Sequence, residues 1–245
     1  MIAGLVLLAL LGGWEAYVRI SGIDALLLPA PSAVAQAIYD DRGLLWDNFT
    51  VTAGEIGLGI AAAVAVGLVC AVAIHFSPVL RRALYPLLVG SQTIPIPVVA
   101  PLLVVWFGFD LGPKIIIVAL VCFFPIVVPT LDALGRVDAG QRKLMRTFGA
   151  SRWQTFRMVE APAALPGLFT GAKLSVAIAA IAAVLAEQAG TEKGLGRTVD
   201  QALAQFETPR AYAAVVVLSL FAVALFGLLA LAERRLLPWA RTTTR

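Results

Sequence analysis

Apolar residues in this chain gather into six long blocks that are separated by shorter polar segments. Each block runs for roughly 18 to 28 residues, which as an α-helix is enough to cross an apolar layer about 30 Å thick. A soluble helical bundle would instead show polar stripes recurring every few residues. The pattern therefore predicts an all-α integral membrane protein in which residues 1–245 form a single membrane domain. The six predicted spans cover residues 2–20, 51–74, 80–107, 114–131, 163–185 and 211–232.

Composition supports the membrane assignment. Hydrophobic residues make up 60% of the chain and the mean hydropathy is +0.90, whereas soluble domains are nearer about 45–50% apolar. The first apolar run resembles the core of a signal peptide, but no basic segment precedes it and no clear small-residue cleavage site follows it. We therefore expect this run to be the first span.

The distribution of basic residues predicts how the chain is oriented. If the N-terminus is cytoplasmic, the segments on the cytoplasmic side hold twelve Lys and Arg and those on the outer side hold six. Cytoplasmic loops of membrane proteins are enriched in Lys and Arg. We therefore expect both termini to face the cytoplasm.

The loop between the fourth and fifth spans, residues 138–160, carries strong local signals. Asp138 is followed three residues later by Gln141, and Ser151 by Gln154, and both spacings are typical of helix N-caps. Gly149, between them, can take the left-handed conformation that ends a helix. We expect two short helices joined by a glycine turn, with an apolar face and an arginine-rich face. Such a pair either touches lipid headgroups or docks a soluble partner.

Prolines interrupt the middle of the third predicted span. Because proline lacks a backbone N–H, it frees carbonyl groups that hydrocarbon tolerates only beside protein or a water-filled cavity. Broken helices at this depth often mark sites in transporters. We expect a substrate path here, and a packing kink is the alternative. The path residues at this break are Gln92, Thr93, Pro95 and Pro97.

Few ionisable side chains fall within the predicted spans. Lys173 either snorkels to the cytoplasmic interface or lines the path. Glu187 ends the fifth span near the outer side, where it acts in gating, contacts a partner or lies in headgroup water. We expect Glu55 to reach the interface and His75 to lie in a loop. A single histidine excludes a multi-histidine metal site.

Residues 148–153, FGASRW, carry a resemblance to a known family. They resemble the cytoplasmic signature of ABC-importer permeases, which is Glu-Ala-Ala, three residues, Gly, nine residues and then Ile-x-Leu-Pro. Gly149 takes the Gly position, Val159 stands for the Ile, and Ala161-Pro162 stands for the Leu-Pro. The sequence departs from the signature at the Glu-Ala-Ala triplet, whose place is taken by Lys143, Leu144 and Met145.

Other stretches resemble one branch of these importers. They are PAPSAVAQAI after the first span, the run from IPIPVVAP to VVPTL, and GLGRTVDQALAQFETPR before the sixth span. Together they are similar to permeases of the nitrate, sulfonate, taurine and thiamine-precursor type.

The resemblance implies a multi-pass permease of the bacterial inner membrane. It implies a second permease copy, two cytoplasmic ABC ATPase subunits and a periplasmic or lipid-anchored binding protein, with no nucleic acid involved. ATP and Mg²⁺ are expected on the ATPase, because this chain has no G-x-x-x-x-G-K-[ST] loop to cradle phosphates. Residues 138–160 would then be coupling helices that insert into a groove on the ATPase. The residues expected at that contact are Lys143, Leu144, Met145, Phe148, Gly149, Ala150, Ser151, Arg152 and Trp153.

Two other function classes fit the sequence less well. An ion-coupled secondary transporter needs carboxylates in mid-membrane, which these spans almost lack. An intramembrane enzyme needs paired catalytic groups, and no Ser/His, Asp/Asp or His-x-x-x-His arrangement occurs. For the substrate, a thiamine-precursor pyrimidine is the best match of the outer parts of the last two spans. Sulfonate, taurine and nitrate stay open as alternatives, although no arginine cluster lies at mid-depth for an anion.

Overall fold

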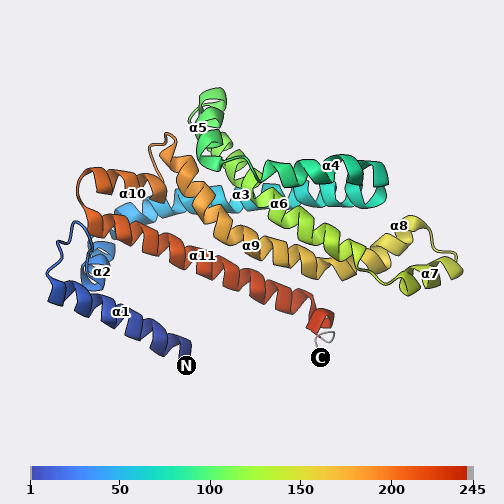
Figure 1. Ribbon diagram of the computed structural model, residues 1–245, viewed down its shortest axis with the longest axis horizontal. Helices are drawn as coiled ribbons and strands as arrows, with labels where there is room; N and C mark the ends of the chain where they lie inside the picture. Colours follow the sequence, from blue (N-terminus) through green and yellow to red (C-terminus); the bar gives the residue numbers. More distant parts are fainter. Residues whose placement is uncertain (1, 242–245) are drawn as a thin grey trace.

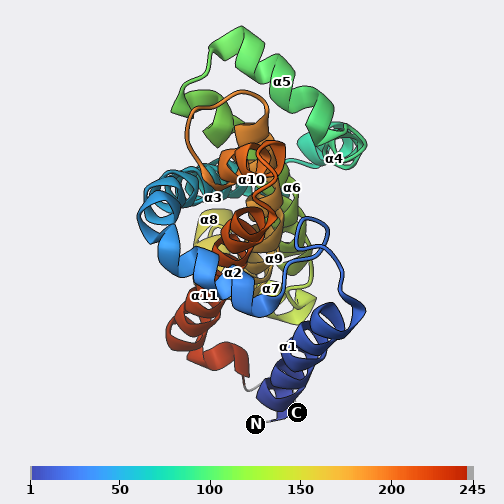
Figure 2. The same ribbon diagram turned by 90° about the vertical axis from the view of Figure 1, so that its left-hand side faces the viewer.

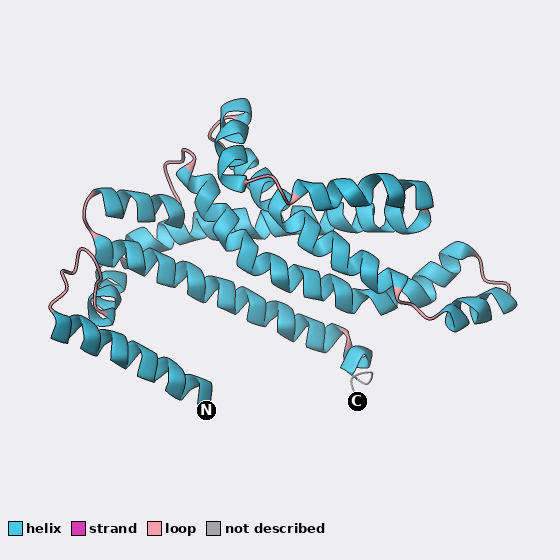
Figure 3. Cartoon of the chain, in the orientation of Figure 1, coloured by secondary structure: helices cyan, strands magenta, loops and turns pink. Residues whose placement is uncertain are grey.

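The computed structural model describes residues 2–241, and these residues form helices and loops with no strand (Figure 3). The helices are joined by short loops. Their bounds are α1 Ile2–Ser21, α2 Pro31–Asp40, α3 Arg42–Phe76, α4 Pro78–Ser91, α5 Ile96–Phe107, α6 Leu111–Gly135, α7 Ala139–Thr147, α8 Arg152–Thr155, the π-helix η1 Phe156–Glu160, α9 Ala161–Gln188, α10 Leu195–Ala204, α11 Thr208–Leu236 and the 3-10 helix η2 Pro238–Arg241.

Five helices of the described chain are long and apolar enough to cross a membrane. They are α1, α3, α6, α11 and a continuous helix made of α8, η1 and α9. The pair α4–α5 meets the same criteria together, but it is bent by 100° at a short break, so it counts as a sixth span if it crosses as a whole. The prediction of an all-α membrane protein is therefore confirmed, with five spanning helices and the bent pair α4–α5 in place of the third predicted span.

Helices α3, α6 and α9 pack together at the centre of the molecule (Figure 1). Small residues let them approach closely: a Cβ placed on Gly171 of α9 would lie 2.3 Å from the carbonyl oxygen of Pro125 in α6. Where lipid gives no hydrophobic drive, such close approach is what holds membrane helices together. The view along the spans places α5 and α1 on opposite sides of this central group (Figure 2).

Helices α3 and α6 run in the same direction. Residue numbers rise together along their contact, because successive positions of α3 lie opposite successive positions of α6. The facing pairs are Glu55 with Lys114, Gly59 with Val118, and Gly67 with Ile126. In contrast, α9 runs antiparallel to α6 (Figure 1). Since α3 and α6 are parallel, the segment between them, α4–α5, has to carry the chain back across the bundle.

Two local details differ from the sequence prediction. The second short helix of the 138–160 loop is not separate from the fifth span, because α8 continues through η1 into α9. In η1 the N–H of Ala161 donates to the carbonyl of Phe156, a π-type bond. This wider turn accommodates Pro162, which cannot donate an ordinary helical bond. The prediction that His75 lies in a loop is also wrong, since it belongs to the last turn of α3.

Candidate functional site

The segment α7–α8 has the local structure that its sequence predicts. Asp138 accepts a hydrogen bond from the N–H of Gln141 at 3.1 Å, and Ser151 and Gln154 form a reciprocal capping box. Gly149, between the two helices, has φ +74°. The caps and the left-handed glycine define the ends of the two helices and the turn between them through local contacts.

This segment presents apolar side chains to its surroundings. Leu144, Phe148 and Trp153 are 56%, 77% and 59% exposed. The inner face of the segment is anchored: Phe156 is buried and stacks on Trp153 with ring centroids 5.3 Å apart. These three side chains form an exposed apolar patch on both sides of the Gly149 turn, which is typical of a docking surface.

Polar contacts tie this segment to the end of α3. The buried carboxylate of Glu160 lies 2.8 Å from His75 Nε2 and 2.7 Å from Arg142 Nε. Arg152 donates to the carbonyl of Phe76 at 3.0 Å. Because Glu160 ends η1 and α9 follows directly, movement of α7–α8 would act on both α3 and α9.

The predicted substrate path lies at the break between α4 and α5. Thr93 Oγ1 donates to the carbonyl of Gly90 at 2.8 Å, and the Gln92 amide lies beside Ser91 at 3.5 Å. A cavity of about 380 Å³ opens here between α3, α4, α5 and α6. Ser91 and Gln92 give it a polar edge, Cys70 lies on its α3 side, and the rest of its lining is mainly apolar. Among the described residues that line it, none is Lys or Arg.

The other predicted path residues have different surroundings. Pro95 lies in the same break as Thr93, Pro97 lies in the first turn of α5, and both are exposed. Lys173 is half-buried and forms a 2.7 Å salt bridge with Glu233 of α11. Glu187 is fully buried at the opposite end of α9 from the α7–α8 segment. The structure therefore brings the residues of the break together but places Lys173 and Glu187 in separate contacts.

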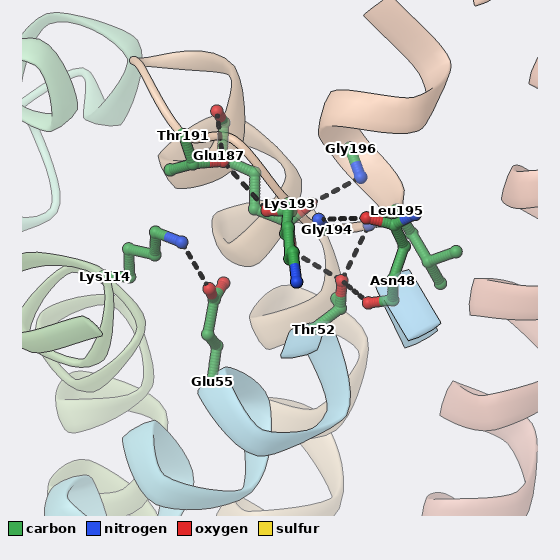
Figure 4. Close-up of polar contacts among 10 residues, drawn as sticks. All are labelled: Asn48, Thr52, Glu55, Lys114, Glu187, Thr191, Lys193, Gly194, Leu195 and Gly196. Atoms are coloured by element: carbon green, nitrogen blue, oxygen red, sulfur yellow. Dashed lines mark hydrogen bonds and ion pairs between the residues drawn. The ribbon is translucent and has the colours of Figure 1, made fainter. Parts of the chain in front are cut away.

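A buried polar cluster surrounds Glu187 (Figure 4). Its Oε1 lies 2.5 Å from Thr52 Oγ1 of α3, and its Oε2 accepts from the N–H of Gly196 at 2.5 Å. Thr52 Oγ1 also accepts from the N–H of Leu195 at 2.9 Å, and Asn48 Oδ1 accepts from the N–H of Gly194 at 2.7 Å. These contacts hold the loop after α9, and the start of α10, against α3.

A buried salt bridge lies beside this cluster. Lys114 Nζ of α6 is 2.7 Å from Glu55 Oε1 of α3, and the two side chains are 8% and 0% exposed. The expectation that Glu55 reaches the interface is therefore wrong. The helix α3 begins at Arg42 rather than at residue 51, so Glu55 lies several turns inside it, facing α6. For Glu187, burial excludes a position in headgroup water.

A signal for this cluster is present in the sequence. Asn48, Thr52 and Glu55 recur at i, i+4 and i+7, which places them on one face of a helix. The polar face is conspicuous because the rest of α3 is mainly apolar. What the spacing alone does not give is the partners on α6, α9 and α10.

Comparison with known proteins identifies the family. Residues 63–238 match the family described as "Binding-protein-dependent transport system inner membrane component". The chain belongs to this family. It is an ABC-importer permease, a multi-span protein of the bacterial inner membrane.

Relatives and solved structures agree with the family. The chain is 33% identical to the formylaminopyrimidine transport permease ThiX of Halalkalibacterium halodurans, covering 93% of this chain and 91% of that one. It is 36% identical to the riboflavin transport system permease RibX of Chloroflexus aurantiacus, covering 95% and 88%. It is 30% identical to the taurine permease TauC of Escherichia coli, covering 95% and 87%. The solved MetNI methionine ABC transporter has the same fold, with a TM-score of 0.66 at 22% identity over 84% of this chain and 99% of that one.

Proposed function

We propose that this permease forms the path through which an ATP-driven importer moves a small planar nitrogen heterocycle, best represented by a thiamine-precursor pyrimidine. The pyrimidine is supported as the substrate by a relative named as a formylaminopyrimidine permease, which is 33% identical over 93% of this chain. The riboflavin permease, at 36% identity, supports a second candidate of the same chemical kind.

The cavity at the α4–α5 break supports a neutral heterocycle over an anion. Its lining is mainly apolar, which suits the faces of a planar ring, and the Gln92 amide offers one acceptor and two donors to a ring edge. Nitrate is an anion, and sulfonates and taurine carry an ionised sulfonate group. Binding sites for such anionic groups are typically built from arginine. The residues that line this cavity offer no cation to them.

We further propose that the transporter contains a second permease copy, two ABC ATPase subunits and a substrate-binding protein. On this proposal the permease itself binds no cofactor, and ATP and Mg²⁺ are held by the ATPase. The exposed apolar patch of Leu144, Phe148 and Trp153 supports α7–α8 as the part that docks on the ATPase. The two caps and the glycine turn support docking over lipid contact, because a lipid surface needs no fixed angle between two short helices.

Uptake into proteoliposomes tests this function. The vesicles would hold the permease with its ATPase, and a binding protein would present labelled formylaminopyrimidine, riboflavin or taurine. We expect ATP-dependent uptake of the pyrimidine or of riboflavin. Uptake of taurine alone would overturn the substrate class. Uptake that needs neither ATP nor the ATPase would instead show an ion-coupled transporter.

A further inference from the structure

The Glu187 cluster contains more buried negative charge than its contacts neutralise. Glu55 and Glu187 are both 0% exposed, and their carboxylates are close enough to interact. Lys114 is paired with Glu55, its Nζ lying 2.7 Å from Glu55 Oε1. If both carboxylates were ionised, the cluster would carry a net negative charge with no access to water. Buried charge of this kind is strongly unfavourable unless it is paired or neutralised by a proton.

The second oxygen of Glu55 shows the same imbalance. Glu55 Oε1 accepts from Lys114 at 2.7 Å, but Glu55 Oε2 is buried and has no hydrogen-bond partner among the described residues. It lies in the interior, with the Glu187 carboxylate close by (Figure 4). Two bare anions would therefore face each other across this space.

The hydrogen bonds of Thr52 allow a neutral Glu187. A threonine hydroxyl has one hydrogen and two lone pairs. The N–H of Leu195 occupies one lone pair at 2.9 Å, and the hydroxyl hydrogen can point to the carbonyl of Asn48 at 3.2 Å. This back-bond to the preceding turn is common for threonine in helices. The second lone pair is then free to accept a hydrogen bond from a protonated Glu187 Oε1, which is 2.5 Å away.

The walls of the site are built closely around the Glu187 carboxyl group. Gly194 has φ +129°, and a Cβ at this position would lie 2.2 Å from the Glu187 carboxyl carbon. A Cβ on Gly196 would lie 2.9 Å from Glu187 Oε2. The backbone of residues 194–196 therefore closes directly over the carboxyl group and leaves its Oε2 as an acceptor for the N–H of Gly196.

We propose that Glu187 is a single-proton site: with the loop closed it is a neutral carboxylic acid that donates to Thr52, while Glu55 stays ionised and paired with Lys114. Closing the loop after α9 then takes one proton from water onto Glu187, and opening it returns that proton to water. The charged side chains that border this site are Glu55 on α3, Lys114 on α6 and Lys193 on the loop (Figure 4). The side chain of Lys193 is exposed. The residues of this site are separate from the cavity at the α4–α5 break, so the proton does not depend on the transported solute.

Infrared spectroscopy of the purified permease tests the proton directly. A protonated carboxylic acid has a carbonyl stretching band that a carboxylate lacks. At about pH 8 exposed glutamic acids are ionised, since their ordinary pKa is about 4.3. A band that remains at this pH therefore reports a buried acid. We expect this band in the wild-type protein and its loss in Glu187→Gln. In Thr52→Val we expect the band to move to higher frequency, because the acid loses its hydrogen-bond acceptor.

Thermal unfolding provides the matched control. Glutamine can donate to Thr52 and accept from Gly196 in the same places as a neutral glutamic acid, so Glu187→Gln should unfold at the wild-type temperature. Glu187→Ala should unfold at a lower temperature. A missing band, a band that survives in Glu187→Gln, or a Glu187→Gln variant as unstable as Glu187→Ala would each overturn the proposal.

Discussion

At the scale of single residues, Lys114 and Glu55 form a salt bridge with both side chains buried. Removing one partner strands the other charge, which typically costs about 3–5 kcal/mol. We expect Lys114→Met to lower the thermal unfolding temperature of the purified permease markedly. The double variant Lys114→Met with Glu55→Met should recover most of that loss, because no charge is then stranded.

A second salt bridge gives the control for this prediction. Lys173 and Glu233 are also 2.7 Å apart, but their side chains are 21% and 24% exposed. Because the side chains of this pair are more exposed, the charge left behind by Lys173→Met is less buried. Lys173→Met should therefore lower the unfolding temperature less than Lys114→Met. Equal losses in the two variants would mean that burial of the Lys114 pair is not what makes it important.

The sequence predicts part of this residue-scale picture. The spacing of Asn48, Thr52 and Glu55 marks one polar face of α3, since i, i+4 and i+7 lie on one side of any helix. Their partners lie 59 to 146 residues away along the chain. Contacts of that separation depend on how whole helices pack, and no local pattern encodes them.

At the scale of elements, Gly149 sets the turn between α7 and α8. Its φ of +74° costs a β-branched residue about 1–2 kcal/mol, although a Cβ at this position would meet no atom within 4 Å. We expect Gly149→Val to redirect α8 while the spans still fold and insert. If α7–α8 docks the ATPase, the ATPase should dissociate from the permease and substrate-stimulated ATP hydrolysis should fall.

Asparagine at the same position separates backbone strain from side-chain bulk. Gly149→Asn adds a side chain but tolerates the left-handed conformation, so it should keep the ATPase bound. Co-purification of the ATPase measures both variants. A Gly149→Val variant that retains the ATPase at wild-type stoichiometry, with normal stimulated hydrolysis, would rule out the docking role and favour lipid contact.

The broken α4–α5 pair carries the second prediction at this scale. We expect Gln92→Cys and Thr93→Cys, each in a Cys70→Ala background, to react with a water-soluble thiol reagent, at a rate that changes when the transporter is trapped with an ATP analogue. Cys70 is removed because it lines the same cavity as Gln92. Cys122, which is 0% exposed, should stay unmodified in the same molecules. Complete protection in every state would leave the prolines with a packing role alone.

The sequence predicts these elements unequally well. The caps at Asp138 and Ser151 and the turn at Gly149 are confirmed, because each depends on a few neighbouring residues. The prolines predict a break in the third span, but not its bend of 100°. Likewise Pro162 signals a disturbance that the chain resolves with the π turn of η1, where a helix start was expected. Proline excludes one hydrogen bond but does not determine which geometry replaces it.

At the scale of the whole molecule, the parallel packing of α3 and α6 determines how often the chain crosses. Gly59 and Gly67 of α3 face Val118 and Ile126 of α6 in the same order. Two helices that follow each other across a membrane can be parallel only if the chain between them returns. The α4–α5 pair is the segment that makes this return, despite its bend. If the pair crosses as a whole, the six crossings place the start of α1 and the end of α11 on the same side as α7–α8 (Figure 1).

The side on which the termini lie is the last prediction. Basic residues are concentrated on the side of α7–α8, which favours the cytoplasm, so reporter proteins fused to the N- and C-termini should both be cytoplasmic. A cysteine at Asp110, in the turn before α6, should be labelled from the opposite side. If α4–α5 were instead a re-entrant loop, the chain would cross five times and the two reporters would lie on opposite sides. That result would also require α3 and α6 to be antiparallel, which their facing residues contradict. The fusion experiment therefore tests the membrane crossing and the helix register together.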